Sequence, residues 1–180
     1  LLLSYFGEMH PAVATSYIGL ADLYASGRQF DLAIQYYLRA QSIYEQFFKP
    51  QDPRFGDVYL GFGDVYKGEA EYEKAIENYQ KALDIYMNSV GKEHQNTVKA
   101  NLEIGNSYMY EEEVLKSLEY YNKVLEINYM LVGELHTNTS GAYNNLGGVY
   151  YFIGNYALAL NYYERALAID KAIYGNDHPN

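Results

Sequence analysis

The chain repeats itself every 42 residues from end to end, without an insertion or deletion. A short turn segment returns one period apart in varied form. It is Gly-Glu-Met-His-Pro at 7–11, Lys-Pro-Gln-Asp-Pro at 49–53, Gly-Lys-Glu-His-Gln at 91–95, Gly-Glu-Leu-His-Thr at 133–137 and Gly-Asn-Asp-His-Pro at 175–179. Fixed spacing over so many units is typical of a solenoid, in which each unit contacts only its neighbours. Such arrays build an extended surface rather than a catalytic pocket. The sequence therefore predicts a binding module.

Each period contains two stretches in which apolar residues recur at three- and four-residue steps, the spacing of one helix face. In the first unit one stretch begins near Pro11, a residue suited to a first helical turn, and the other begins near Phe30. The later units predict helices near 53–67, 72–88, 95–109, 114–130, 137–151 and 156–173. No strand pattern is left over, so we expect an all-α fold.

Composition narrows the class of partner. The 180 residues are 49% hydrophobic and 17% aromatic, enough to bury a continuous core. A net charge of -10 disfavours nucleic acid and anionic membranes, because proteins that bind phosphates need a basic face. The chain lacks cysteine, which is compatible with a reducing compartment, and no apolar stretch is long enough for a membrane helix. We expect a cytoplasmic protein.

The residues in the repeating columns resemble a known family. The first unit fits the pattern of a tetratricopeptide repeat, with the matching positions Tyr17, Leu20, Ala21, Tyr24, Ala33, Tyr37 and Ala40. A small residue recurs in one column, as Ala21, Gly63, Gly105 and Gly147. Glycine inside a helix costs roughly 1 kcal/mol relative to alanine, so its recurrence indicates close packing of the paired helix.

The whole chain resembles the long-unit tetratricopeptide proteins typified by kinesin light chains. The familiar 34-residue unit would place proline in one column near the end of the second helix, where this chain has Glu45, Met87, Tyr129 and Lys171. The second helix is therefore expected to run about two turns further. The resemblance implies a right-handed superhelical solenoid of antiparallel helix pairs.

We expect a single array over residues 1–180, with four repeats at 11–52, 53–94, 95–136 and 137–178. Residues 1–10 align with the tail of a preceding repeat, and residues 179–180 with the start of a further one. We therefore expect a fragment of a longer protein. Its uncapped apolar ends predict head-to-tail stacking between molecules.

No residue pattern predicts catalysis, a cofactor or a metal. The four histidines, His10, His94, His136 and His178, occupy one column of the repeat. Successive units hold them at least about 8–10 Å apart, whereas zinc needs ligands within about 2.0–2.3 Å of one point. We interpret them as turn residues at helix starts. No phosphate loop, metalloprotease helix or nucleophile elbow is present, so we expect no enzyme.

The resemblance also implies that the first helix of each repeat lines a concave groove. Leu60, Leu102 and Met109 would offer apolar contacts there, and the asparagines would pair with a peptide backbone. Asn144-Asn145-Leu146 resembles the Asn-Asn-Leu stretch of kinesin light chains. The candidate peptide-contact residues are Ile18, Asp22, Leu60, Asp64, Lys67, Lys99, Leu102, Asn106, Met109, Asn144, Asn145 and Tyr151.

The charges of the predicted groove favour a neutral or basic peptide. Two cations, Lys67 and Lys99, are offset by four acids, Asp22, Asp57, Asp64 and Glu103. The leading hypothesis is a protein interaction scaffold or adaptor that holds an extended or helical segment of a partner protein. The alternatives are a regulatory domain that senses a signalling peptide, and a spacer or engineered consensus-like array without a ligand of its own.

Overall fold

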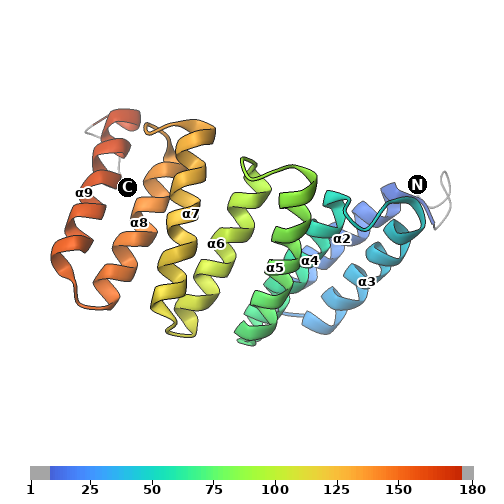
Figure 1. Cartoon of the computed structure of the whole chain (residues 1–180). Coiled ribbons are helices and arrows are strands. Elements are labelled where there is room, and N and C mark those ends of the chain that lie inside the picture. The colour runs from blue at the N-terminus through green and yellow to red at the C-terminus, as the bar shows by residue number, and fades with distance from the viewer. Residues whose placement is uncertain (1–8, 176–180) are drawn as a thin grey trace. The chain divides into compact units, whose positions relative to one another are not determined.

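The computed structural model describes residues 9–175. This part of the chain consists of helices and short turns, and the expected all-α fold is confirmed (Figure 1). Each helix begins where the apolar periodicity predicts and ends within about two residues of the predicted end. The helices are α2 (Pro11–Ser26), α3 (Phe30–Phe47), α4 (Pro53–Gly68), α5 (Tyr72–Ser89), α6 (Gln95–Tyr110), α7 (Val114–Val132), α8 (Thr137–Phe152) and α9 (Tyr156–Tyr174).

The chain divides into two compact units, residues 1–91 and residues 92–180. The N-terminal unit contains the pairs α2/α3 and α4/α5, and the C-terminal unit contains α6/α7 and α8/α9. In each unit the second helix of the first pair also packs against the first helix of the next, as α3 does on α4 and α7 on α8. Each unit therefore repeats the same helix-pair stacking.

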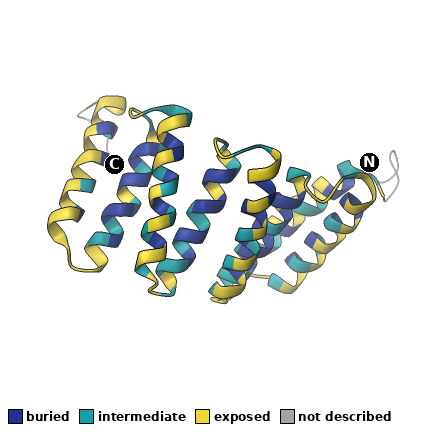
Figure 2. Cartoon of the chain, viewed as in Figure 1, coloured by how far each residue is buried: buried dark blue, intermediate teal, exposed yellow. Residues whose placement is uncertain are grey.

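Both units bury apolar side chains between their helices (Figure 2). In the N-terminal unit one continuous cluster includes Tyr37, Tyr44 and Phe55. In the C-terminal unit the buried residues form smaller clusters around Tyr121, Val124 and Tyr143, and Leu125 packs against each of these. Among residues 9–175 the buried tyrosines come mainly from the second helices, and the first-helix column of Tyr24, Tyr66, Tyr108 and Tyr150 is half-buried.

The small residues in the repeating column allow the two helices of a pair to approach each other. A Cβ atom added at Gly63 would overlap the ring of Tyr79. At Gly105 it would lie 2.9 Å from the ring of Tyr121, which is closer than side chains normally approach. The expectation that this column sets the close helix packing is confirmed.

The histidine column caps the first helices. The Nδ1 atoms of His10, His94 and His136 each accept a hydrogen bond from a backbone N–H two residues later, at 3.1 Å. Asp52 does the same for α4 through its carboxylate, again at 3.1 Å. The interpretation as turn residues at helix starts is confirmed for these three histidines, and His178 lies outside the described residues.

Candidate functional site

Tyrosine hydroxyls from the second helices hold polar side chains on the first helices. Within a pair, the hydroxyl donates to a residue 15 positions earlier. The Oη–Oδ1 distances for this set are 2.5 Å for Tyr37 to Asp22, 2.7 Å for Tyr79 to Asp64, and 2.7 Å for Tyr121 to Asn106. We call these three contacts the tyrosine ties. They fix the direction of side chains that the sequence predicts as peptide contacts.

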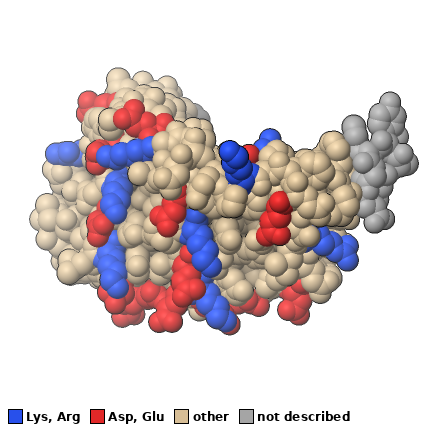
Figure 3. All heavy atoms as spheres, turned by 45° about the vertical axis from the view of Figure 1, so that its right-hand side comes forward, with Lys and Arg blue, Asp and Glu red and all other residues tan. Residues whose placement is uncertain are grey.

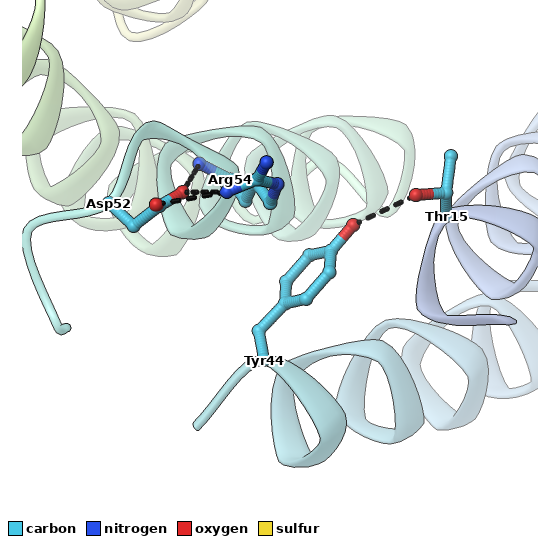
Figure 4. A network of polar contacts seen from close by, with 4 residues as sticks. All are labelled: Thr15, Tyr44, Asp52 and Arg54. Carbon is cyan, nitrogen blue, oxygen red and sulfur yellow. Dashed lines mark hydrogen bonds and ion pairs between the residues drawn. The ribbon is translucent and has the colours of Figure 1, made fainter. Parts of the chain in front are cut away.

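A second tyrosine column makes a similar contact one helical turn before the end of the second helix. Tyr86 donates to Asp57 at 2.6 Å, and the hydroxyls of Tyr44 and Thr15 lie 3.3 Å apart (Figure 4). Each of these pairs spans 29 residues. The same figure shows Arg54 at the start of α4 bound to Asp52, with Nη1–Oδ distances of 3.0 Å.

Burial keeps Tyr37, Tyr86 and Tyr121 protonated and able to donate. It raises the pKa of Tyr37 and Tyr86 well above the ordinary value, and the bonded carboxylates of Asp22 and Asp57 raise it further. Burial also raises the pKa of Tyr121 to about 12. These phenols therefore remain neutral donors at physiological pH, and their hydrogen bonds orient the carboxylates of Asp22 and Asp57.

In the N-terminal unit the predicted contact residues differ in accessibility. Asp22 is exposed, and Ile18, Asp64 and Lys67 are half-buried. The Lys67 ammonium lies 3.5 Å from the Asp64 carboxylate. Leu60 is only 4% exposed, so the expectation that it presents an apolar contact on the surface is wrong. This face of the unit is acidic and largely polar.

In the C-terminal unit two hollows lie along the first helices. The first, which we call the aromatic hollow, has a volume of 590 Å³. Four predicted contact residues line it, namely Met109, Asn144, Asn145 and Tyr151. Its other lining residues were not predicted from the sequence; they are Tyr121, Gly148, Val149, Phe152 and Tyr156. Gly148 occupies the column of Asp22, Asp64 and Asn106, and its lack of a side chain helps to open this space.

The second hollow, which we call the amide hollow, has a volume of 340 Å³. Three predicted residues line it, namely Lys99, Leu102 and Asn145. The lining residues that were not predicted from the sequence are Gln95, Val98, Val124, Asn128, Thr137, Asn138, Gly141 and Ala142. Asn145 lines both hollows, which are therefore adjacent. The one signal of this site in the sequence is Asn128, which breaks the tyrosine column of Tyr44 and Tyr86.

Asn106 lines neither of the two hollows. It is fixed by its tie to Tyr121, and its Nδ2 donates to a Glu103 carboxylate oxygen at 3.4 Å. The other predicted contact residues of this unit lie along the two adjoining hollows. They are Lys99, Leu102, Met109, Asn144, Asn145 and Tyr151.

The charged side chains are mixed on the visible surface. On the face seen in Figure 3, blue and red groups alternate, and red groups gather along the lower edge. Across residues 9–175, no group of three or more histidine, aspartate or glutamate side chains is placed to hold a metal ion. Within the same range, no helix combines the length and the apolar character that crossing a membrane requires.

Family models decide the classification. The model described as tetratricopeptide repeat matches residues 54–127 and 96–172, and a second model with the same description matches residues 14–47. The chain belongs to the tetratricopeptide repeat family. Members of this family are protein interaction scaffolds and are typically not enzymes, so the general role as a scaffold follows from membership. A search of curated proteins by sequence gives no match.

Solved structures with the same fold include kinesin-light-chain-like proteins. BtubC (BKLC) from P. vanneervenii is 22% identical with a TM-score of 0.81, over 95% of this tetratricopeptide chain and 68% of that one. A putative kinesin light chain from Podosopora anserina with nearly identical TPR-like repeats is 17% identical with a TM-score of 0.77, over 96% and 82%.

A bacterial phosphatase shares the fold as well. Aspartyl phosphate phosphatase F from Bacillus subtilis is 17% identical with a TM-score of 0.80, over 93% of this chain and 42% of that one. At these identities the likeness establishes the helix-pair fold. The resemblance to kinesin-light-chain-like repeats is confirmed at that level.

Proposed function

We propose that this tetratricopeptide chain is an adaptor that binds an extended or helical segment of a partner protein along its first helices. The observation that supports this most directly is the pair of adjoining hollows in the C-terminal unit, joined by Asn145. The aromatic hollow offers apolar side-chain contacts, and the amide hollow offers donors and acceptors for a peptide backbone. Pockets that combine apolar walls with a few polar groups are the usual form of a recognition site.

The charges support a neutral or basic ligand. In the N-terminal unit Asp22 and Asp57 are held in place by tyrosine hydroxyls, so their carboxylates attract a lysine or arginine without a further loss of side-chain entropy. Asp64 is held in the same way but already pairs with Lys67. In the C-terminal unit the hollows are lined mainly by amides and apolar groups, with one cation, Lys99. We also propose that the protein is cytoplasmic, because a chain without cysteine needs no disulfide bonds and suits a reducing compartment.

A peptide array tests this proposal. The full chain is applied to a library of peptides that vary in sequence and charge, and the peptides it retains are measured again in solution. Asn145→Ala is expected to weaken binding because this residue lines both hollows, and Lys99→Glu is expected to shift selectivity toward basic peptides. The matched control is Asn161→Ala, which removes an exposed asparagine on α9 that lines neither hollow.

Selective binding that Asn145→Ala weakens and Asn161→Ala preserves supports the adaptor. If the retained peptides bind the Asn145→Ala and Lys99→Glu variants as tightly as the original chain, the binding site does not lie along these helices. A chain that retains no peptide at all would favour the spacer alternative.

A further inference from the structure

Two tyrosines meet at the boundary between the third and fourth repeats. Tyr129 lies near the end of α7 and Tyr143 lies in α8, and their hydroxyl oxygens are 2.8 Å apart. The ring centroids are 6.5 Å apart and the ring planes stand at 87°, an edge-to-face arrangement. Both helices belong to the C-terminal unit, so the contact lies within one compact body.

The pair occurs at one boundary of the repeat. No other unit has a tyrosine in the column of Tyr129, where the sequence has Leu3, Glu45, Met87 and Lys171. At the boundary inside the N-terminal unit, Glu45 and Tyr59 occupy the columns of Tyr129 and Tyr143. The contact between hydroxyls is therefore specific to the third and fourth repeats and is not a requirement of the fold.

The two rings differ in their access to solvent. Tyr129 is 37% exposed, whereas Tyr143 is 4% exposed. A reagent in solution therefore reaches Tyr129 first. A covalent bond to Tyr143 must form within the chain, because a second molecule cannot bring a ring against a buried one.

Hydrogen bonds connect the buried phenol to an exposed carboxylate. Those to Tyr143 and Glu134, together with burial, raise the pKa of Tyr129 to about 12, and Tyr143 makes the largest contribution. A carboxylate only accepts, so Tyr129 donates its single hydroxyl proton to Glu134, and Tyr143 donates to Tyr129. The Arg165 guanidinium lies 5.7 Å from the centroid of the Tyr143 ring. Because this cation opposes a positive charge on the ring, an electron leaves Tyr143 only together with the hydroxyl proton.

We propose that Tyr129 and Tyr143 form an oxidative modification site, at which a dityrosine cross-link joins the third repeat to the fourth. The inference does not depend on the proposed peptide binding. The oxidant is a peroxide used by a peroxidase, which removes one electron at a time from an accessible phenol.

The hydrogen bonds give the order of the steps. Tyr129 loses an electron to the peroxidase and its proton to Glu134, which leaves a phenoxyl radical. A hydrogen atom then passes from the Tyr143 hydroxyl to the Tyr129 oxygen across the 2.8 Å contact. A second oxidation of Tyr129 places two phenoxyl radicals side by side.

The two radicals combine at ring carbons. A phenoxyl shares its unpaired electron with the two carbons beside the oxygen, so a C–C bond forms between one such carbon on each ring. The hydrogen on each of these carbons leaves as a proton, and each oxygen regains a proton. In total two C–H bonds break, one C–C bond forms, and two electrons and two protons reduce one hydrogen peroxide to two water molecules.

Other close tyrosine pairs present the wrong surfaces for this bond. Tyr24 and Tyr36 stack with centroids 5.3 Å apart and planes at 5°, and Tyr150 and Tyr162 stack at 5.4 Å and 8°. Stacked rings meet through their faces, whereas the new bond joins the edges beside the hydroxyls. Hydroxyls in contact bring those edges together, which favours the pair at the repeat boundary.

The test treats the full chain, at low concentration, with hydrogen peroxide and a peroxidase. A denaturing gel isolates single chains from chains joined to one another. Digestion after glutamate separates residues 127–134, whose only tyrosine is Tyr129, from residues 135–164, which contain Tyr143. We expect mass spectrometry to find these two peptides linked, with the loss of two hydrogen atoms and the fluorescence of dityrosine.

Three variants decide the assignment. Tyr129→Phe is expected to abolish the linked peptide and to keep the helical circular dichroism, because the side chain is partly exposed. The control Tyr110→Phe, at a position 62% exposed on α6, should cross-link as the original chain does. Glu134→Gln removes the proton acceptor and should slow the appearance of dityrosine fluorescence in single chains.

Three results would overturn the inference. The first is an absence of dityrosine in single chains of the original protein. The second is a set of linked peptides that join other tyrosines in place of Tyr129 and Tyr143. The third is equal single-chain fluorescence in the original chain and in Tyr129→Phe. An unchanged rate in Glu134→Gln would refute the proposed path of the proton.

Discussion

One capping residue precedes each first helix, and both histidine and aspartate serve as this cap. His136 caps α8 through Nδ1, which accepts the Asn138 N–H at 3.1 Å. Asp52 makes the equivalent contact at α4. A side-chain acceptor at this position satisfies a backbone N–H that has no partner within the helix, so either residue type suffices.

Replacing the cap at α8 should lower stability by a predictable amount. His136→Ala removes the acceptor and is expected to reduce the free energy of unfolding by about 1 kcal/mol, measured by urea denaturation followed by circular dichroism. His136→Asp is the matched control, because it installs the cap that α4 uses, and it should retain most of the stability. Equal losses in both variants would show that the imidazole contributes through something other than its acceptor.

The sequence could predict the role of these histidines because their column and the following helix pattern are both visible in it. It could not predict the accessibility of a given column. Ile18 is half-buried, Leu60 is buried and Asn144 is exposed, although all three share one column. Exposure depends on which side chains surround a position, and these differ between repeats. Asn128 was overlooked for the same reason, since an unfilled space is a property of neighbours rather than of one residue.

At the scale of helices, the spacing of apolar residues was sufficient to place every described helix. The second helices α7 and α9 are each followed by a glycine, Gly133 and Gly175, whose φ values of 82° and 83° lie in the left-handed region that favours glycine. Each of these helices continues until the glycine, whose positive φ ends it. The observed helix ends therefore lie slightly beyond the stretches of periodic apolar residues.

Close packing of α4 on α5 depends on Gly63. Gly63→Ala would drive a methyl group into the ring of the fully buried Tyr79, and we expect a loss of about 1–3 kcal/mol in the free energy of unfolding. Gly19→Ala is the control, because it lies within α2 where an added Cβ meets no atom within 4 Å. That change should stabilise by about 0.5–1 kcal/mol through helix propensity. Chemical denaturation of both variants tests the contrast, and a stabilised Gly63→Ala would contradict it.

Buried tyrosine hydroxyls between paired helices make the stability of the fold sensitive to alkaline pH. The pKa of Tyr121 is about 12 in the folded chain, against about 10 for an exposed phenol. Below pH of about 10 both states are protonated and the stability is fully present. Above it the unfolded phenol loses its proton first, so stability falls as pH rises toward 12. Tyr37 and Tyr86, whose pKa values are also raised, add to this loss.

Urea denaturation over a series of pH values measures this loss. Stability should be flat near neutral pH and decline beyond about pH 10. Tyr121→Phe is expected to be less stable at neutral pH, because Asn106 loses its donor, and to show a shallower alkaline decline. An alkaline slope that is unchanged in Tyr121→Phe would indicate that this phenol titrates alike in both states.

At the scale of the whole molecule, α9 carries an apolar row that residues 92–175 of its own unit leave exposed (Figure 2). Leu160 and Leu167 are 59% and 50% exposed, with Tyr163 between them. One period earlier the same columns hold Leu118, Tyr121 and Leu125 of α7, and these pack in the core against α8. The outer face of α9 thus carries the same kinds of side chain as the face of α7 that packs against the next first helix, α8.

We expect a second copy of the chain to cover this face with α2, whose Leu23 is 68% exposed. Contacts of this kind join different surfaces and do not close on themselves, so association should continue with concentration. Light scattering is therefore expected to give a mass that rises as the protein is concentrated. The double variant Leu160→Lys and Leu167→Lys should remain monomeric, whereas Leu115→Lys, at a position 83% exposed on α7, should associate as the original chain does. A constant monomer mass at every concentration of the original chain would refute this arrangement and leave the apolar row of α9 free for a different protein.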